Sequence, residues 1–320
     1  MSAMTTEPGW ARTPIEPQSV DAPLSRSAVF LTLTLSGHAD AASRARSVLG
    51  DLGGLVRAVG FRDLGGHLSC VAAIGSEAWD AVTGLSRPAQ LHPFPAVVGP
   101  AHTAPSTPGD LFFHIRAERA DMCFELERLL LDKLGDAIIV TDETVGFRYF
   151  DSRDLLGFVD GTENPTGAGM TEWSLVGDDD PDHAGGSYIV VQKYLHDLTA
   201  WQSLTTETQE KIIGRTKPDN VELDDLARPS HKDLATIVDD AGVEHDILRD
   251  NMPFGSPGSG EFGTYFIGYS KDVWVTERMV SNMFLGDPPG SYDRILDFSR
   301  AVTGTTFFAP SNDVLDSWGD

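Results

Sequence analysis

Apolar residues in the first half of the chain alternate with polar ones or run together over short stretches, as they do in β-strands. On this pattern, strands are predicted at residues 29–35, 55–61, 68–74 and 111–117. In other stretches the apolar residues recur at helical spacing, which predicts helices at 40–49 and 121–134. The segments 137–140 and 144–149 predict one more strand or a hairpin.

The second half of the chain repeats this mixture of strands and helices. Strands are predicted at 187–195 and 264–272, and helices at 205–214, 232–237, 273–285 and 292–301. These elements lack the regular strand–helix–strand rhythm of a doubly wound parallel sheet, so the pattern favours an α+β fold. At 320 residues the chain is long enough for two domains. We therefore expect an extended arm at 1–25, which is rich in proline, and domains at 26–150 and 151–320.

Two loop segments contain patterns that are found in known binding sites. The acidic stretch Gly177–Gly186 could bind a cation, but its spacing differs from the EF-hand pattern and favours a solvated loop. Gly258, Gly260 and Gly263 have the spacing of a dinucleotide fingerprint. That fingerprint requires a strand before it and a helix after it, whereas here a turn precedes and a strand-like segment follows. We interpret these glycines as part of a flexible loop.

Composition and charge limit the possible partners. The chain has 48 acidic and 24 basic residues and a net charge of -24, which argues against binding to nucleic acid or to an anionic membrane. Its apolar stretches are far shorter than the ~18 residues needed to cross a bilayer, and the N-terminus has no basic segment followed by an apolar run. Cys70 and Cys123 lie in apolar surroundings and are expected to be buried and reduced. A cytoplasmic protein is the simplest interpretation.

Two short segments hold polar residues that could carry chemistry. Asp160 stands between the apolar residues that follow Gly157 and a turn formed around Gly161. Such an acid either caps the turn or acts as a functional carboxylate, and spacing alone favours the cap. Further along, Arg249 and Asn251 stand two residues apart, so that in an extended backbone both side chains face the same way. That arrangement suits charge stabilisation, although a surface ion pair would have the same spacing.

The histidines do not form a zinc-binding pattern. His231 follows a break at Pro229 and Ser230 and precedes a short segment with helical spacing. From the residues alone, a structural or exposed position is favoured over the role of a ligand.

Together these segments resemble the dye-decolorizing peroxidase family, and its shorter bacterial B-type members in particular. The family has a GxxDG signature, a distal arginine and asparagine, a proximal haem ligand, and an acid that accepts a hydrogen bond from that ligand. In this chain the matching residues are, in the same order, Gly157, Asp160 and Gly161, then Arg249 and Asn251, then His231, and then Asp293. The matches extend from about residue 147 to 308.

The resemblance implies two ferredoxin-like domains with antiparallel sheets, arranged like a dimeric α+β barrel, with haem b in the C-terminal domain. It also implies a haem peroxidase that reduces hydrogen peroxide through a ferryl intermediate. Dyes, phenols or other one-electron donors would be oxidised, and the physiological donor is not identified by the sequence. B-type relatives also suggest a homo-oligomer, with a hexamer as one option. The chain lacks the basic-hydrophobic tail that directs some relatives into protein nanocompartments, which argues against encapsulation.

The resemblance also assigns roles to individual residues. His231 would bind the iron, and Asp293 would make it a stronger donor. Arg249 would stabilise charge on the departing peroxide oxygen. The remaining implied residues are Asp160 as proton carrier, Asn251 to orient peroxide, and Gly161, Thr162 and Glu163 beside the cofactor.

Other assignments stay open. Glu163 could lie at the haem edge or bind Mn²⁺, although a surface position is favoured. Electrons from large donors would pass through surface aromatic residues, and the sequence does not discriminate among Tyr149, Tyr188, Tyr194, Trp201 and Trp274. A haem-handling or iron-releasing protein would need no distal Asp160 or Arg249, so their presence favours the peroxidase. A non-haem module of two ferredoxin-like domains would make the matches coincidental.

Overall fold

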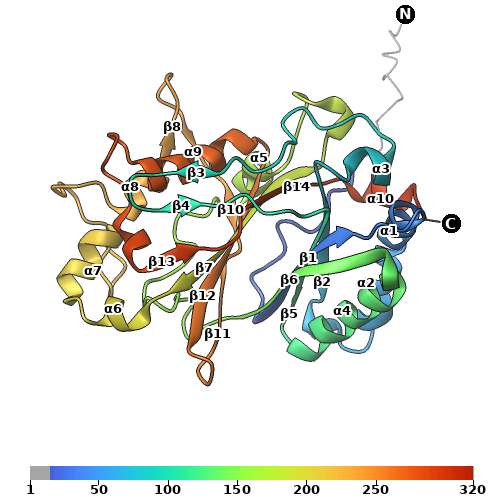
Figure 1. Cartoon of the computed structure of the whole chain (residues 1–320), viewed down its shortest axis with the longest axis horizontal. Helices are drawn as coiled ribbons and strands as arrows, with labels where there is room; N and C mark the ends of the chain where they lie inside the picture. The colour runs from blue at the N-terminus through green and yellow to red at the C-terminus, as the bar shows by residue number, and fades with distance from the viewer. Residues whose placement is uncertain (1–14, 320) are drawn as a thin grey trace, which may run out of the picture.

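Strands from the first half of the chain form one half of the main sheet in the computed structural model, which describes residues 15–319 (Figure 1). They are β1 (Ser27–Leu35), β2 (Ser69–Gly75), β5 (Leu111–Ala117) and β6 (Ile138–Phe147). Their order across the sheet is β2-β5-β1-β6, and every pairing is antiparallel. The helices of this half are α1 (Ala41–Gly50), α2 (Leu52–Gly60), α3 (Trp79–Thr83) and α4 (Ala120–Leu134). A small separate hairpin joins β3 (Val97–Val98) and β4 (Thr103–Ala104).

The second half of the chain repeats this arrangement. Its strands β7 (Ser187–His196), β10 (Leu248–Arg249), β12 (Glu261–Ser270) and β14 (Thr305–Ala309) lie in the order β10-β12-β7-β14. Counted within each half, this is the same order as in the first half. Also in this half, β11 (Met252–Ser256) pairs with β12, β13 (Ser299–Ala301) pairs with β7, and β8 (Ile237–Val238) forms a hairpin with β9 (Glu244–His245). Its helices are α5 (Ala168–Ser174), α6 (Leu198–Gln202), α7 (Thr206–Ile213), α8 (His231–Ala235), α9 (Val273–Leu285) and α10 (Asn312–Asp316).

The two halves share one sheet because β14 pairs with β2. The Gln18 side chain lies beside this junction, where its amide oxygen accepts from the backbone nitrogen of Ala72 at 2.8 Å. The amide nitrogen of Gln18 donates to the carbonyls of Ala72 and Pro310 at 2.7 and 2.8 Å. Since these bonds replace ladder bonds, the buried amide ties residues from both ends of the chain to the sheet.

The sheet curves so strongly that its two ends meet, and β6 at one end lies against β11 at the other. A Cβ atom placed on Gly146 of β6 would come within 2.7 Å of the Cβ of Met252 and 3.1 Å of the Phe30 ring. The sheet is therefore nearly closed into a barrel. The prediction of an α+β fold with antiparallel sheets is confirmed.

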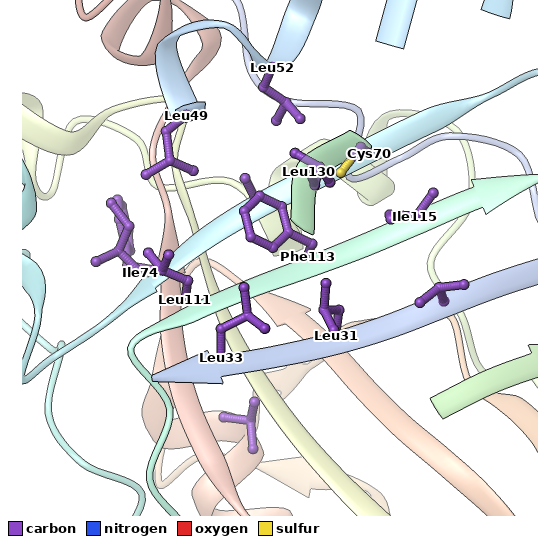
Figure 2. Packing of buried hydrophobic residues seen from close by; sticks show 14 of the residues in the cluster. Leu31, Leu33, Leu49, Leu52, Cys70, Ile74, Leu111, Phe113, Ile115 and Leu130 are labelled. Atoms are coloured by element: carbon purple, nitrogen blue, oxygen red, sulfur yellow. The ribbon is translucent and has the colours of Figure 1, made fainter. Parts of the chain in front are cut away.

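Apolar side chains fill both faces of the curved sheet. On the inner face the ring of Phe30 stacks between those of His114 and Tyr265, at centroid distances of 4.6 and 4.2 Å. On the outer face, Phe113 of β5 packs among leucines of the neighbouring strands and helices (Figure 2). Successive residues of a strand serve the two layers in turn, as Phe30 and Leu31 do.

Some predicted elements are wrong. Residues 55–61 were expected in a strand but lie largely in α2, because Leu52, Leu55 and Val59 are spaced to be buried on one face of a helix. Residues 292–301 were expected in a helix but form a 3₁₀ turn, Arg294–Asp297, followed by β13. The Asp293 side chain caps this turn by accepting from the Ile295 nitrogen. By contrast, the segments 137–140 and 144–149 belong mainly to a single strand, β6, which is one of the two predicted alternatives.

The glycine pattern does not have the structural context of a dinucleotide-binding site. Gly258 and Gly260 lie in the turn between β11 and β12, and Gly263 lies in β12, so the dinucleotide pattern is not followed by a helix. No group of three or more metal-ligating side chains occurs within residues 15–319, the acidic stretch included. Cys70 and Cys123 are buried and unpaired, as expected. In the part of the chain that the structure describes, no helix is both long and apolar enough to cross a membrane.

The predicted arm, residues 1–25, falls partly outside the described residues, which begin at residue 15. From there to residue 25 the chain has no helix or strand but buries Gln18 and Val20. The division into this arm and domains at 26–150 and 151–320 stays a prediction.

The contact between β6 and β11 can be tested by adding one methyl group. Gly146→Ala should lower the free energy of unfolding by roughly 1–3 kcal/mol, because the new Cβ overpacks a filled interior. Gly37→Ala is the matched control, since a Cβ at that position meets nothing within 4 Å. Urea denaturation measures both variants. A Gly146→Ala protein as stable as the control would contradict the close approach of the two strands.

Candidate active site

A cavity lies on the outer face of the second half of the sheet, between the sheet and the helices α8 and α9. Alternate residues of β7, namely Gln192, Tyr194 and His196, line it together with Thr264 and Phe266 of β12. Together with the open space at its mouth, the cavity encloses about 1480 Å³. Other apolar walls come from Leu156, Phe158, Ile213, Ile247, Met279, Val280, Met283 and Ile295. The lining of the cavity therefore suits a mainly apolar ligand.

The predicted site residues meet at this cavity although they are far apart in the sequence. Those that line it are Asp160, Gly161, Thr162, Glu163, His231, Arg249 and Asn251. Asp293 is fully buried behind His231.

His231 is the first residue of α8 and is held firmly on one side. Ser230 and Asp233 form a capping box that fixes the start of this helix. The ring Nδ1 of His231 is 2.7 Å from Oδ2 of Asp293, whose Oδ1 accepts from the Ile295 nitrogen at 3.0 Å. Because Nδ1 is occupied, Nε2 is the ring nitrogen that can bind a ligand in the cavity.

The charge of the His231 ring depends on its partner. Burial by itself lowers the pKa of His231, but the attraction and hydrogen bond of Asp293 outweigh this effect, so the pKa is raised. The imidazole is therefore hydrogen-bonded to a fully buried carboxylate. The same pair occurs in metal sites, where the carboxylate orients the histidine that binds the metal.

A second polar group in the cavity consists of Asp160, Arg249 and Asn251. The Asn251 Nδ2 donates to Oδ1 of Asp160 at 3.3 Å, and its Oδ1 accepts from the Ile267 nitrogen at 3.1 Å. Burial raises the pKa of Asp160, while Arg249 and the bond from Asn251 oppose the rise and reduce it only in part. The group thus combines a carboxylate that holds its proton more readily than usual with a fixed positive charge.

The turn that carries Asp160 is stabilised by the side chain of Asp154 and not by that of Asp160. Asp154 Oδ1 accepts from the Phe158 nitrogen at 2.9 Å, whereas the Asp160 carboxylate is bonded by Asn251. Burial raises the pKa of Asp154 to about 7, and the nearby Asp160 adds to the rise. Asp154 also lines the cavity, so a second proton-binding carboxyl is present that the motif did not reveal.

Arg249 is clamped by an amide that was also missed. The Asn164 side chain accepts from the Arg249 nitrogen at 3.1 Å and donates to the Arg249 carbonyl at 2.6 Å. The turn formers Asn164 and Pro165 could have pointed to this position, but not to its partner 85 residues away. Gly161, which lies between Asp160 and Asn164 in the sequence, has φ +79°, a conformation that favours glycine.

Cations lie at the mouth of the cavity beside Glu163. Arg215 pairs with Glu163, donates to the Asn220 carbonyl at 2.7 Å, and has a buried Nε without a partner among residues 15–319. Lys232, next to His231, pairs with Glu222. Thr162 Oγ1 accepts from Asn220 at 2.9 Å. Neither cation stands in a sequence pattern, so only the fold identifies them.

The candidate electron-transfer residues divide by burial. Tyr188, Tyr194 and Trp201 are buried. Tyr149 and Trp274 are partly exposed. The ring of Trp274 lies 4.9 Å from that of His245, which lines the cavity.

Comparison with known proteins agrees with this geometry. Residues 17–148 match the family described as Dyp-type peroxidase, N-terminal, and residues 151–314 match Dyp-type peroxidase, C-terminal. The chain belongs to the Dyp-type peroxidase family.

Individual members of the Dyp-type peroxidase family are close in sequence and in structure. A dye-decolorizing peroxidase of Mycobacterium tuberculosis is 55% identical over 94% of this chain and 90% of its own length. DyPB from Rhodococcus jostii RHA1 has a TM-score of 0.92 at 60% identity, covering 95% of this chain and 98% of that one. Variants of that DypB were solved in complex with haem. An encapsulated DyP-type peroxidase from Mycobacterium smegmatis has a TM-score of 0.92 at 54% identity, covering 96% and 99%.

Membership in this family decides among the functions left open by the sequence. The chain is an enzyme, a peroxidase of the dye-decolorizing type. The haem-handling protein and the non-haem module are not supported.

Proposed function

We propose that this peroxidase binds haem b in the cavity of its C-terminal half, with Nε2 of His231 as the iron ligand. Haem is the cofactor, and when bound it supplies the redox chemistry by which hydrogen peroxide is reduced and a one-electron donor is oxidised. The observation that carries the proposal is the bond of 2.7 Å between His231 and Asp293. It fixes the ring tautomer with Nε2 free for a metal.

The cavity suits haem in other respects as well. Its apolar walls match the porphyrin, while Arg215 and Lys232 at the mouth suit the carboxylates that haem carries. The unpartnered Nε of Arg215 supports this fit, because a buried donor without an acceptor costs about 1–3 kcal/mol. Gly161, Thr162 and Glu163 are proposed to lie beside the same cofactor.

The residues of the second polar group are proposed to act on hydrogen peroxide. Asp160 would accept a proton from one peroxide oxygen and return it to the other. Arg249 would place its fixed charge where negative charge develops as the O–O bond breaks. Asn251, already bonded to Asp160, would orient the bound molecule. The charge of Arg249 is harder to replace than a proton carrier, because water can also carry a proton.

The donor that is oxidised remains unnamed, and dyes and phenols are the proposed class. For donors too large for the cavity we propose Trp274 as the point of electron entry, since its ring contacts the cavity residue His245. Peroxide would then be reduced beside Asp160, and the large donor would be oxidised at Trp274. Mn²⁺ oxidation at Glu163 is not part of the proposal, because Arg215 already neutralises that carboxylate.

Assembly into a homo-oligomer is proposed from the outer face of β6. As an edge strand it exposes apolar side chains, among them Ile139, Val145 and Phe147, at 58%, 54% and 38%. Such a patch favours association with another surface. A hexamer in the cytoplasm is the expected form.

The ligand assignment predicts the outcome of removing the imidazole. His231→Ala should fail to bind haem stably or should change the coordination of the iron, because among the described histidines that line the cavity only His231 is bonded to a fully buried carboxylate. The visible spectrum of the haem-reconstituted variant measures this. His92→Ala, which alters a partly exposed histidine that does not line the cavity, serves as the control. A wild-type ferric spectrum in His231→Ala would show that the assignment is wrong.

The distal residues are predicted to differ in importance. Arg249→Leu should slow the reaction with hydrogen peroxide by roughly a hundredfold or more, since a preorganised charge is lost. Asp160→Ala should have the smaller effect. Stopped-flow decay of the resting Soret band gives the second-order rate constants at several pH values.

The pH profile separates proton transfer from charge stabilisation. Only ionised Asp160 accepts a proton, and its pKa is raised. The wild-type rate should therefore fall as the pH drops through that raised value, and Asp160→Ala should lose this part of the profile. If Asp160→Ala were the slower variant at every pH, the ranking of the two residues would be wrong.

The assembly is predicted to exceed one chain. Light scattering at micromolar concentration should give a multiple of 34.6 kDa, and Val145→Asp should reduce the mass by placing charge in the exposed patch. Asp132→Asn, on an exposed side chain of α4 that is not one of the apolar patch residues, is the control. A wild-type mass of a single chain would contradict the proposal.

A further inference from the structure

The segment that carries Arg249 and Asn251 lies at a break in a strand. β10 and β11 pair with β12 in one continuous register, Leu248 with Tyr269 and Met252 with Tyr265. Between them, Asp250 and Asn251 are not part of either strand. The backbone nitrogen of Asp250 reaches the Ile267 carbonyl only at 3.3 Å, which is longer than the usual ~2.9–3.0 Å.

Side chains replace the missing ladder bonds at this break. The Ile267 nitrogen donates to the Asn251 side chain instead of a carbonyl. The Arg249 nitrogen donates to the Asn164 side chain. The positions of Arg249 and Asn251 therefore depend on side-chain contacts more than on the sheet itself.

Asp250 points away from the cavity, because successive residues of an extended chain face opposite ways. It is 4% exposed, and its Oδ2 accepts from Nη1 of Arg116 at 2.9 Å. Arg116 belongs to β5 of the first half, is 1% exposed, and also donates to the Ser19 carbonyl. Its guanidinium thus links the start of the described chain, the N-terminal half and the distal segment.

The surroundings of this ion pair leave Asp250 few other partners. His114 Nε2 is 4.0 Å from the same carboxylate oxygen, while its Nδ1 is bonded to the Tyr269 hydroxyl at 2.8 Å. Arg116 therefore supplies the one hydrogen bond of the Asp250 carboxylate among the described residues.

We propose that Arg116 is a positioning residue for the distal site, which fixes Arg249 and Asn251 by holding Asp250 from the other half of the barrel. The proposal rests on the proposed function for its effect on peroxide, but not for its effect on the backbone. Arg116 itself does not line the cavity.

The decisive variant removes both charges. Arg116→Met alone leaves a buried carboxylate without compensation and endangers folding, so it is combined with Asp250→Asn. The control is Lys193→Met with Asp142→Asn, which neutralises the ion pair of 2.9 Å between β7 and β6, also across the two halves. Lys193 and Asp142 do not line the cavity.

Two measurements distinguish positioning from general stability. Amide hydrogen exchange at residues 249–252 of the haem-free protein should be at least tenfold faster in the Arg116/Asp250 variant than in the control. Fluoride affinity of the haem-loaded ferric protein should fall about tenfold, because fluoride accepts hydrogen bonds from distal donors. Arg116→Lys keeps the charge, so it should show a smaller rise in exchange and a smaller loss of fluoride affinity than the Arg116/Asp250 variant.

The results can overturn the proposal independently of the cofactor assignment. If exchange at 249–252 rises no more in the Arg116/Asp250 variant than in the control, Arg116 acts only on stability and the proposal is wrong. If exchange rises as expected but haem is not bound through His231, the positioning role stands and the proposed function fails instead.

Discussion

The bond between His231 and Asp293 is the constraint on which the rest of the site depends. A fully buried carboxylate is costly unless its oxygens are bonded, and Asp293 meets this requirement with one imidazole and one backbone nitrogen. The first of these partners begins α8 and the second lies in the 3₁₀ turn after α9. One acid therefore joins two segments that would otherwise be independent, and the joint turns the imidazole toward the cavity.

The residues on the other side of the cavity are held in a different way. Asp160, Arg249 and Asn251 come from loops and a broken strand, which the backbone alone does not hold rigidly. Their geometry depends on buried amides and ions, among them Asn164 and the pair formed by Arg116 and Asp250. On the side proposed to bind iron, the start of α8 and a 3₁₀ turn thus fix the imidazole, whereas a network of side chains defines the side proposed to bind peroxide.

Local patterns in the sequence predicted the strands well where the two faces of a strand differ or both are apolar. β5 was predicted at its observed bounds, because all its residues from Leu111 to Ala117 are buried. The helix α2 was mistaken for a strand because its glycines and valines resemble a strand locally, whereas the burial of Leu52 and Val59 is decided by tertiary packing. The same limit explains the site. Asp160 and Arg249 stand in short motifs, but Asn164, Arg215 and Arg116 act through partners 52 to 134 residues away, which no local spacing encodes.

The repeated strand order of the two halves has a consequence for the origin of the cavity. Both halves have the same strand order, and β14 of the second half pairs with β2 of the first. In the first half the long helix α4 fills the outer face with leucines; in the second, the corresponding space is covered by the short α8 and by α9 and stays hollow. A void in a protein of one unit would weaken its only core. With two halves of the same strand order in one sheet, the fully packed first half can stabilise the fold while the second half keeps a cavity open.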